Sequence, residues 1–110
     1  MSKYHNRKVT IDGFTFHSQK EGDYYCEVKL RFNAGDILGF ELQPEFILQE
    51  AFTDSMGKKH RAIKYKADFR ILHSVYEQEI VDVKGMKTKE YMIKKKLFLK
   101  RYPEFKFSEI

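Results

Sequence analysis

The chain has 110 residues, which fits one domain and leaves little room for a second. Hydrophobic residues make up 42% of the chain and aromatic residues 15%, so it can form a core and is not a disordered basic tail. Lys and Arg number 21 against 16 Asp and Glu, and this formal net charge of +5 makes nucleic acid the first partner to consider.

The sequence carries no sign of a membrane or an oxidising compartment. No run approaches the roughly 18–20 apolar residues that a membrane span needs. The N-terminal stretch MSKYHNRKVTIDG is basic and lacks the apolar centre of a signal peptide. The single cysteine, Cys26, excludes an intramolecular disulfide framework. We therefore expect a cytoplasmic protein with no membrane partner.

The first part of the chain predicts a hairpin and then a helix. Residues 7–16 alternate around an Asp-Gly pair, which is typical of a short hairpin. Ser18 followed by Glu21 resembles a capping box, so a helix is expected over Gln19–Asn33, ending at Gly35.

Three strands are expected next. Phe40–Glu50 and Arg61–Leu72 are rich in Phe, Ile and Leu, and Asp54–Lys59 would turn between them. A third strand covers about Glu79–Lys84 and stops at a glycine.

A second helix and a final strand complete the chain. The helix covers roughly Lys87–Arg101 and is broken by Pro103, and the alternating segment Glu104–Ile110 predicts the last strand. The order α-β-β-β-α-β indicates an α/β fold, with two helices flanking a mixed sheet.

The positive charge is concentrated in one segment. Lys84–Arg101 contains eight basic residues and one acid, Glu90, so it carries +7 while the other residues together carry −2. A solvated helix face would explain such a segment, but its charge density also favours contact with phosphates. The residues predicted to bind nucleic acid are Lys87, Lys89, Lys94, Lys96, Lys100 and Arg101.

Candidate chemistry lies on two predicted strands. Ile63, Tyr65, Ala67, Phe69 and Ile71 fall on one face of the second strand by the period of two, which puts Asp68 on the other.

The third strand carries the sequence Asp82-Val83-Lys84, which places a carboxylate and an ammonium on one side. If the two strands are neighbours, Asp68 and Asp82 together suit Mg²⁺ or Mn²⁺, and Lys84 can stabilise the charge that develops on a phosphate. An ordinary surface ion pair of Asp82 with Lys84 is the competing interpretation.

Each predicted helix carries a polar residue on its apolar face. Glu21 falls in the middle of the apolar arc of the first helix, where it closes the capping box, serves a metal site, or does both. Lys95 lies within the apolar arc of the second helix, one turn from Tyr91, and could reach toward the strand that carries Lys84. The alternative for Lys95 is a side chain that extends over the core to reach solvent.

Glu21, Asp68 and Asp82-Val83-Lys84, followed by a basic helix, resemble the motif of the PD-(D/E)XK nuclease superfamily. FHSQKEGDYYCEVKL, YKADFRI and VDVKGMKTKEYMIKKKLF further resemble a phage and prophage protein family that is grouped with Holliday-junction resolvase-like enzymes. The resemblance spans nearly the whole chain. It implies a single nuclease-like domain over residues 1–110, with an αβββαβ restriction-endonuclease-like core, in the cytoplasm of a bacterial host cell.

The resemblance also implies a role for each site residue. Glu21, Asp68 and Asp82 would bind one or two Mg²⁺ or Mn²⁺ ions, Lys84 would assist the attacking water, and polar residues of the following helix, Tyr91 and Lys95, would support the site. Two positions depart from the expected pattern.

At the first of these positions, Ala67 stands where the motif has proline. At the second, Gly22 follows Glu21 inside the helix, where glycine costs about 1 kcal/mol relative to alanine.

These observations predict a metal-dependent endonuclease that hydrolyses phosphodiester bonds in DNA, with branched or junction DNA among its substrates. Junction resolution needs two active sites and would require a homodimer. Two alternatives stay open: a non-catalytic nucleic-acid-binding module on the same fold, and a factor that engages a host protein. Salt-sensitive binding that does not depend on a metal would indicate the first, and no binding to nucleic acid at low salt would indicate the second.

Overall fold

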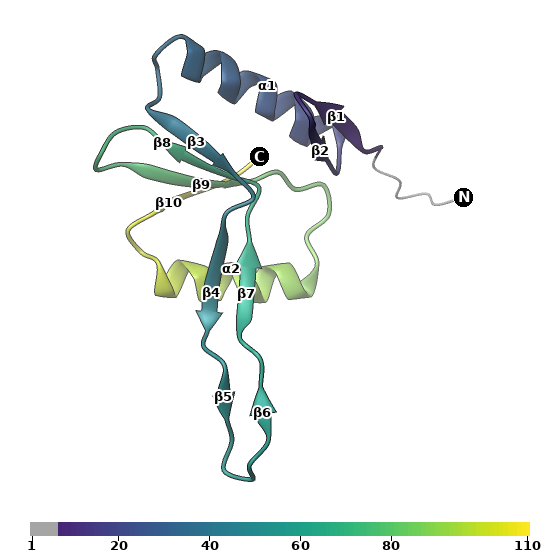
Figure 1. Cartoon of the computed structure of the whole chain (residues 1–110), viewed down its shortest axis with the longest axis vertical. Coiled ribbons are helices and arrows are strands. Elements are labelled where there is room, and N and C mark those ends of the chain that lie inside the picture. Colours follow the sequence, from purple (N-terminus) through teal and green to yellow (C-terminus); the bar gives the residue numbers. More distant parts are fainter. Residues whose placement is uncertain (1–6) are drawn as a thin grey trace.

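The computed structural model describes residues 7–110, and its centre is a four-stranded mixed sheet with the strand order β10-β9-β8-β3 (Figure 1). The first six residues, which belong to the basic N-terminal stretch, lie outside the described residues. The elements in chain order are β1 (Val9–Ile11), β2 (Phe14–Phe16), α1 (Gln19–Asn33), β3 (Gly39–Leu42), β4 (Glu45–Gln49), β5 (Phe52–Thr53), β6 (Lys59–His60), β7 (Ile63–Lys66), β8 (Phe69–Leu72), β9 (Gln78–Asp82), α2 (Lys89–Arg101) and β10 (Lys106–Glu109).

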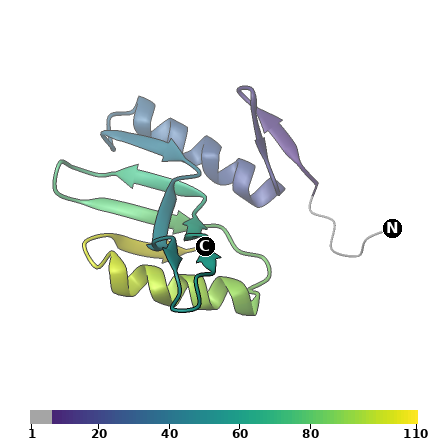
Figure 2. The ribbon, with the colours of Figure 1, turned by 60° about the horizontal axis from the view of Figure 1, so that its bottom comes forward.

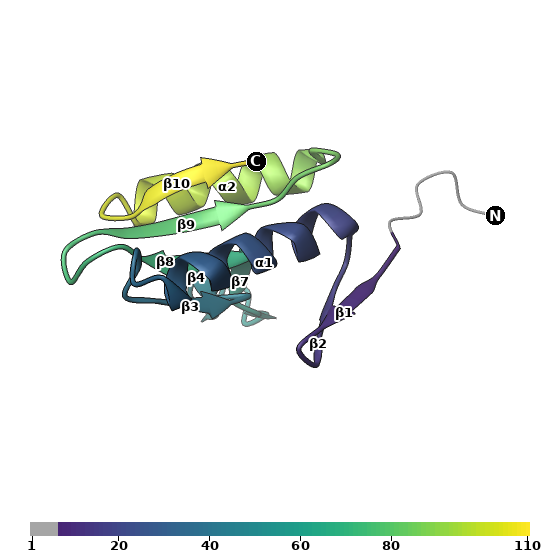
Figure 3. The same cartoon turned by 90° about the horizontal axis from the view of Figure 1, so that it is seen from above.

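The two helices cover opposite faces of this sheet (Figure 2, Figure 3). β3 and β8 are antiparallel, as are β8 and β9, whereas β9 and β10 are parallel. The adjacent residues Ile80 and Val81 of β9 point to opposite sides, as the pleat requires. Val81 packs in a core cluster with Val28 of α1, and Ile80 packs in another with Phe98 of α2. The expected α/β class is therefore confirmed.

The first helix begins and ends where the sequence predicts. Its start is fixed by the Ser18 side chain, which accepts a hydrogen bond from the Glu21 backbone N–H at 3.1 Å. After Asn33 the chain turns at Gly35, whose φ of +81° is easily adopted only by glycine. The hairpin predicted over residues 7–16 is also present as β1 and β2.

The other elements are shorter than the sequence predicts. α2 begins at Lys89 and not at Lys87, because the Thr88 side chain caps it by accepting from the Tyr91 N–H at 3.1 Å. β9 ends at Asp82, because the N–H of Val83 donates to a side chain and not to a neighbouring strand. The last strand keeps only Lys106–Glu109 of the predicted Glu104–Ile110.

The two longest predicted strands are each broken in the middle. Phe40–Glu50 is interrupted at Gln43, which has a φ of 52°, and at Pro44, which has no N–H to donate. Its partner Arg61–Leu72 breaks at the same level, after Lys66.

The prediction that alternate residues from Ile63 to Ile71 share one face is wrong for this reason. Tyr65 and Ala67 belong to the cluster under α2, Phe69 and Ile71 belong to the cluster under α1, and Ile63 is exposed. The break turns the β4–β7 pair relative to the main sheet, and the strands continue outward as the β5–β6 hairpin (Figure 1).

None of the helices between residues 7 and 110 has the length and apolar composition to cross a membrane.

Gly22 of α1 is required by the close approach of the β1–β2 hairpin. A Cβ at this position would lie 2.6 Å from Val9 Cγ2 and 3.1 Å from Ile11 Cδ1. The glycine that weakens the helix is therefore what lets the hairpin pack against it.

We expect Gly22→Ala to lower the free energy of unfolding by about 1–2 kcal/mol in urea denaturation, although alanine is the better helix former, because overpacking outweighs propensity. Gly39→Ala is the matched control, since a Cβ there meets no heavy atom within 4 Å. A Gly22→Ala protein as stable as the wild type would contradict this packing.

Candidate functional site

Of the four residues predicted to bind the metal or assist the attacking water, three line one cavity of about 290 Å³. The cavity lies where α1 begins and where the chain leaves β9, and its polar walls include Glu21, Asp68 and Lys84. Asp82 is absent from its lining and is fully buried behind it. The remaining lining residues are His17, Ser18, Lys20, Val83 and Gly85.

Glu21 is a buried carboxyl group that its own helix does not satisfy. The residue is 4% exposed, and its Oε1 atom has no hydrogen-bond partner among the described residues. Burial, and then the nearby charge of Asp68, raise the pKa of Glu21 to about 7. The Ser18 half of the predicted capping box is present, and Glu21 Oε1 is a buried oxygen without a hydrogen-bond partner among the described residues.

Asp68 lies at the break between β7 and β8 and joins the two central strands. Its Oδ2 accepts a hydrogen bond from the Val83 N–H at 2.7 Å, and its own N–H donates to the Val81 carbonyl at 3.2 Å. Burial raises the pKa of Asp68, although the Val83 N–H and Lys84 act in the opposite direction. The last residues that pair between β8 and β9 are Phe69 and Val81. Asp68 and Asp82 come directly beyond this pair, Asp68 next to Phe69 and Asp82 next to Val81.

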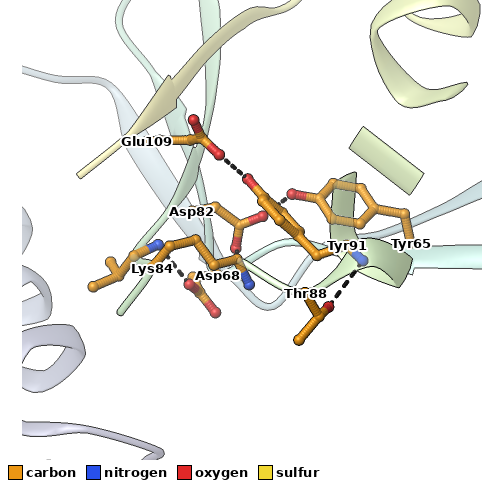
Figure 4. Close-up of polar contacts among 8 residues, drawn as sticks. Tyr65, Asp68, Asp82, Lys84, Thr88, Tyr91 and Glu109 are labelled. Atoms are coloured by element: carbon orange, nitrogen blue, oxygen red, sulfur yellow. Dashed lines mark hydrogen bonds and ion pairs between the residues drawn. The ribbon is translucent and has the colours of Figure 1, made fainter. Parts of the chain in front are cut away.

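Asp82 is the most deeply buried charged group of the site. Its Oδ2 accepts a hydrogen bond from the Tyr65 hydroxyl, and its Oδ1 lies 3.4 Å from the Lys84 ammonium without a hydrogen bond (Figure 4). Burial raises the pKa of Asp82 to about 6, even though Lys84 lowers it. The predicted placement of Asp82 and Lys84 on one side is confirmed.

A second group of side chains supports Lys84 from α2 and β10. The Lys84 ammonium lies 4.3 Å from the centre of the Tyr91 ring, which places a cation over an aromatic face. The Tyr91 hydroxyl donates to Glu109 Oε2, and Lys95 donates to Glu109 Oε1 at 2.8 Å. These bonds, first from Lys95 and then from Tyr91, lower the pKa of Glu109 to about 2. Tyr91 and Lys95 therefore meet at the Glu109 carboxylate, and Figure 4 shows the contact that Tyr91 makes with it.

Sequence reasoning missed two residues of this arrangement, Glu109 and Tyr65. Glu109 is paired with Asp82 by the parallel register of β10 and β9, which no local pattern encodes. The sequence places Tyr65 only on one face of the second strand; the residue is 3% exposed, and its hydroxyl donates to Asp82. The position of Tyr65 two residues before Ala67 carried no separate signal.

The oxygen atoms present are of the kind that Mg²⁺ and Mn²⁺ prefer. Two of them, Glu21 Oε1 and Asp82 Oδ1, are buried and form no hydrogen bond within residues 7–110, and buried polar atoms are normally paired. Within residues 7–110, no three His, Cys, Asp or Glu side chains already stand close enough together to hold a metal ion. The donor set fits a divalent cation, and its carboxylates would have to converge to bind one.

The basic segment is partly neutralised within the fold. Lys87 lies 3.4 Å from Glu109, Lys94 lies 3.3 Å from Glu90, and Arg101 lies 3.3 Å from Glu50 while it also donates to the Leu48 carbonyl. The remaining predicted contacts, Lys89, Lys96 and Lys100, are exposed and have no ion pair in the described part of the chain. Half of the predicted nucleic-acid-binding residues thus remain fully available.

A family model described as "Protein of unknown function (DUF1064)" matches residues 1–110. Comparisons with curated proteins and with solved structures gave no match.

The raised pKa of Glu21 predicts a pH-dependent stability. Between about pH 4.5 and 7 the unfolded chain loses this proton before the folded chain does, so stability falls as the pH rises through this window. In a chelating buffer, we expect Glu21→Gln to be more stable than the wild type by roughly 2–3 kcal/mol at pH 8 and by little at pH 4.5. Urea denaturation at both pH values tests this, with Glu27→Gln on the exposed side of α1 as the control. A difference that does not vary with pH would contradict the placement of Glu21.

Proposed function

The chain belongs to the DUF1064 family, and we propose that this member is a metal-dependent deoxyribonuclease. The observation that carries the proposal is the meeting of Glu21, Asp68 and Lys84 at one cavity, with Asp82 held 3.4 Å from the Lys84 ammonium. Three carboxyl groups face one lysine there, which suits a phosphodiester substrate bound together with a divalent cation.

The arrangement of the sheet supports a restriction-endonuclease-like core. α1, β3, β8, β9, α2 and β10 follow one another in the αβββαβ order of the PD-(D/E)XK superfamily. The β4–β7 and β5–β6 pairs are then extensions of the hairpin that joins β3 to β8.

The proposed roles follow from what each side chain can reach. Asp68 and Asp82 would hold Mg²⁺ or Mn²⁺, with Glu21 completing the site directly or through water. When bound, the cation would supply stabilisation of the negative charge that develops on the phosphate. Lys84, which lines the cavity and is paired with Asp82, would orient the attacking water or stabilise the same charge. Tyr65 fixes the orientation of Asp82 through its hydroxyl.

The proposed substrate is DNA of phage or prophage type, including branched or junction DNA, in the cytoplasm of a bacterial host. The exposed Lys89, Lys96 and Lys100 would contact its phosphates, so affinity should fall steeply as salt rises. Action on a four-way junction would further require a homodimer, because two strands must be cut.

A non-catalytic nucleic-acid-binding module is the second candidate. The observation that favours it is the burial of Asp82 between Tyr65 and Lys84, which an ion pair with a purely structural role would also produce. Metal-dependent cleavage separates the two candidates.

The purified protein is expected to cleave linear, nicked or four-way-junction DNA in Mg²⁺ or Mn²⁺, and Asp82→Asn and Lys84→Ala are each expected to reduce the rate at least about 100-fold. Asp36→Asn, an exposed acid outside the site, is the control. Mn²⁺ should also raise the melting temperature of the wild type but not that of Asp68→Asn, which reports binding without activity. No cleavage by the wild type, or equal cleavage by the site variants, would refute the nuclease.

Glu109→Gln is expected to lower the cleavage rate about 10–100-fold, because Glu109 holds Tyr91, whose ring lies against the Lys84 ammonium. The KM for DNA should change little, since Glu109 acts through Lys84 and not on the substrate. Glu104→Gln, at an exposed position just before β10, is the matched control. An unchanged kcat for Glu109→Gln would exclude this positioning role.

A further inference from the structure

The β5–β6 hairpin projects from the body of the molecule as a narrow finger, residues 52–61 (Figure 1). It continues the β4–β7 pair away from the central sheet, along the longest dimension of the protein, 54 Å. It packs on neither helix of the core, so the α/β core does not require it.

The finger is held in one shape by its own contacts. Asp54 Oδ1 accepts hydrogen bonds from the backbone N–H groups of Met56 at 2.9 Å and Lys58 at 3.0 Å. Asp54 Oδ2 lies 2.8 Å from His60 Nε2, and the His60 ring stacks on Phe52 with 4.7 Å between ring centres. An ordered finger loses little conformational entropy when it binds, and this favours a role in binding.

The outer surface of the finger is cationic with an apolar tip. Met56 is 89% exposed at the turn, and Lys58, Lys59 and Arg61 are exposed behind it. None of these three basic residues forms an ion pair within residues 7–110. The finger contains one acid, Asp54, and its carboxylate is already used inside the turn.

The finger is also continuous with the candidate site. Lys66, on the strand that leads into the finger, lines a second cavity of about 250 Å³ together with Lys84 and Lys94. Between Lys66 and the finger, Lys64 is half neutralised by Glu45 at 3.5 Å. A line of positive charge therefore runs from Lys84 along β7 to Lys58.

This combination of shape and charge fits a nucleic-acid duplex better than a protein. Lysine is depleted at protein interfaces, whereas it binds phosphates readily. A two-stranded β-ribbon fits the major groove of DNA, which is about 12 Å wide, and an apolar tip such as Met56 can contact base edges and thymine methyl groups there.

The length of the finger sets where it would touch the duplex. From Lys66 to Lys59 the chain advances seven residues, which is about 23 Å at roughly 3.3 Å per strand residue. This equals about seven steps of roughly 3.4 Å along a DNA strand. We propose that the finger enters the major groove of duplex DNA about seven base pairs from the phosphate nearest Lys66, with Lys58, Lys59 and Arg61 on the backbone and Met56 at the base edges. This inference rests on the proposed function for where the duplex lies at the site.

The first test measures binding to a 30-base-pair duplex in a chelating buffer, where no metal-dependent cleavage occurs. Lys58→Gln/Lys59→Gln should weaken binding about fivefold or more at 100 mM salt and reduce the slope of log affinity against log salt by about 2. The control, Arg31→Gln/Lys106→Gln, removes the same charge far from the finger and should match the wild type. Equal affinity and slope in both double variants would overturn the proposal.

The second test uses crosslinking from the tip. In a Cys26→Ser background, Met56→Cys carrying a photoactivatable group should crosslink to the duplex, and Tyr76→Cys, 97% exposed in the loop before β9, should not. Equal crosslinking from both positions, or none from Met56→Cys, would overturn the proposal.

The two tests separate the finger from the nuclease. A wild type that binds through the finger but never cuts in Mg²⁺ or Mn²⁺ would refute the proposed function and support the DNA-binding finger. A wild type that cuts DNA while the finger variants bind and crosslink like their controls would support the proposed function and refute the DNA-binding finger. No binding of the wild type to the duplex at 50 mM salt would overturn the finger and point to a protein partner for it.

Discussion

The hydrogen bond from the Val83 N–H to the carboxylate of Asp68 is the contact on which the arrangement of the site depends. At the end of β9 the Asp68 side chain takes the place of the next partner on β8, so the Val83 N–H is satisfied while the ladder with β8 stops. Val83 then packs toward the core under α1, and its neighbours Asp82 and Lys84 face Tyr65 and Tyr91 on the other side. Asp68 thereby fixes the orientation of a segment that lies fifteen residues away in the chain.

The same segment is held from its other side by the last strand. The Lys84 N–H donates to the Ile110 carbonyl at 3.0 Å, and the Ile110 N–H donates to the Asp82 carbonyl at 2.9 Å. Asp82 is thus placed rigidly in a position where burial opposes its ionisation, and a buried ion pair of this kind is commonly no more stabilising than apolar packing. Stability alone does not explain such a residue between Val81 and Val83. The proposed role of its charge, in binding a cation or in holding Lys84, would explain it.

Local patterns predicted the elements whose boundaries are set by local chemistry. α1 was found at both ends because Ser18 and Gly35 act within one turn of the helix they bound. The shared face expected from Ile63 to Ile71 failed because the break originates in the partner strand, at Pro44, whose position opposite Ala67 depends on the pairing. Glu109 was missed for the same reason, since its distance from Asp82 is set by the register of two strands separated by a helix. Side chains on separate strands become a site only through pairing that the sequence does not display.

The charge that is available at the surface also could not be predicted from the sequence, because it depends on which side chains the fold brings together. The segment Lys84–Arg101 has a large positive net charge in the sequence. The fold brings Glu109 and Glu50 to it from elsewhere in the chain, and they form ion pairs with its basic side chains. The finger has a smaller positive net charge. Its one acid, Asp54, is hydrogen-bonded within the turn to the backbone N–H groups of Met56 and Lys58 and to the His60 ring. The charge available to a phosphate on α2 is therefore lower than the sequence indicates, whereas Lys58, Lys59 and Arg61 of the finger form no ion pair within residues 7–110. Because attraction to DNA depends on the charge that remains unpaired at the surface, the cationic face extends outward from Lys84 along the finger and is not confined to the helix.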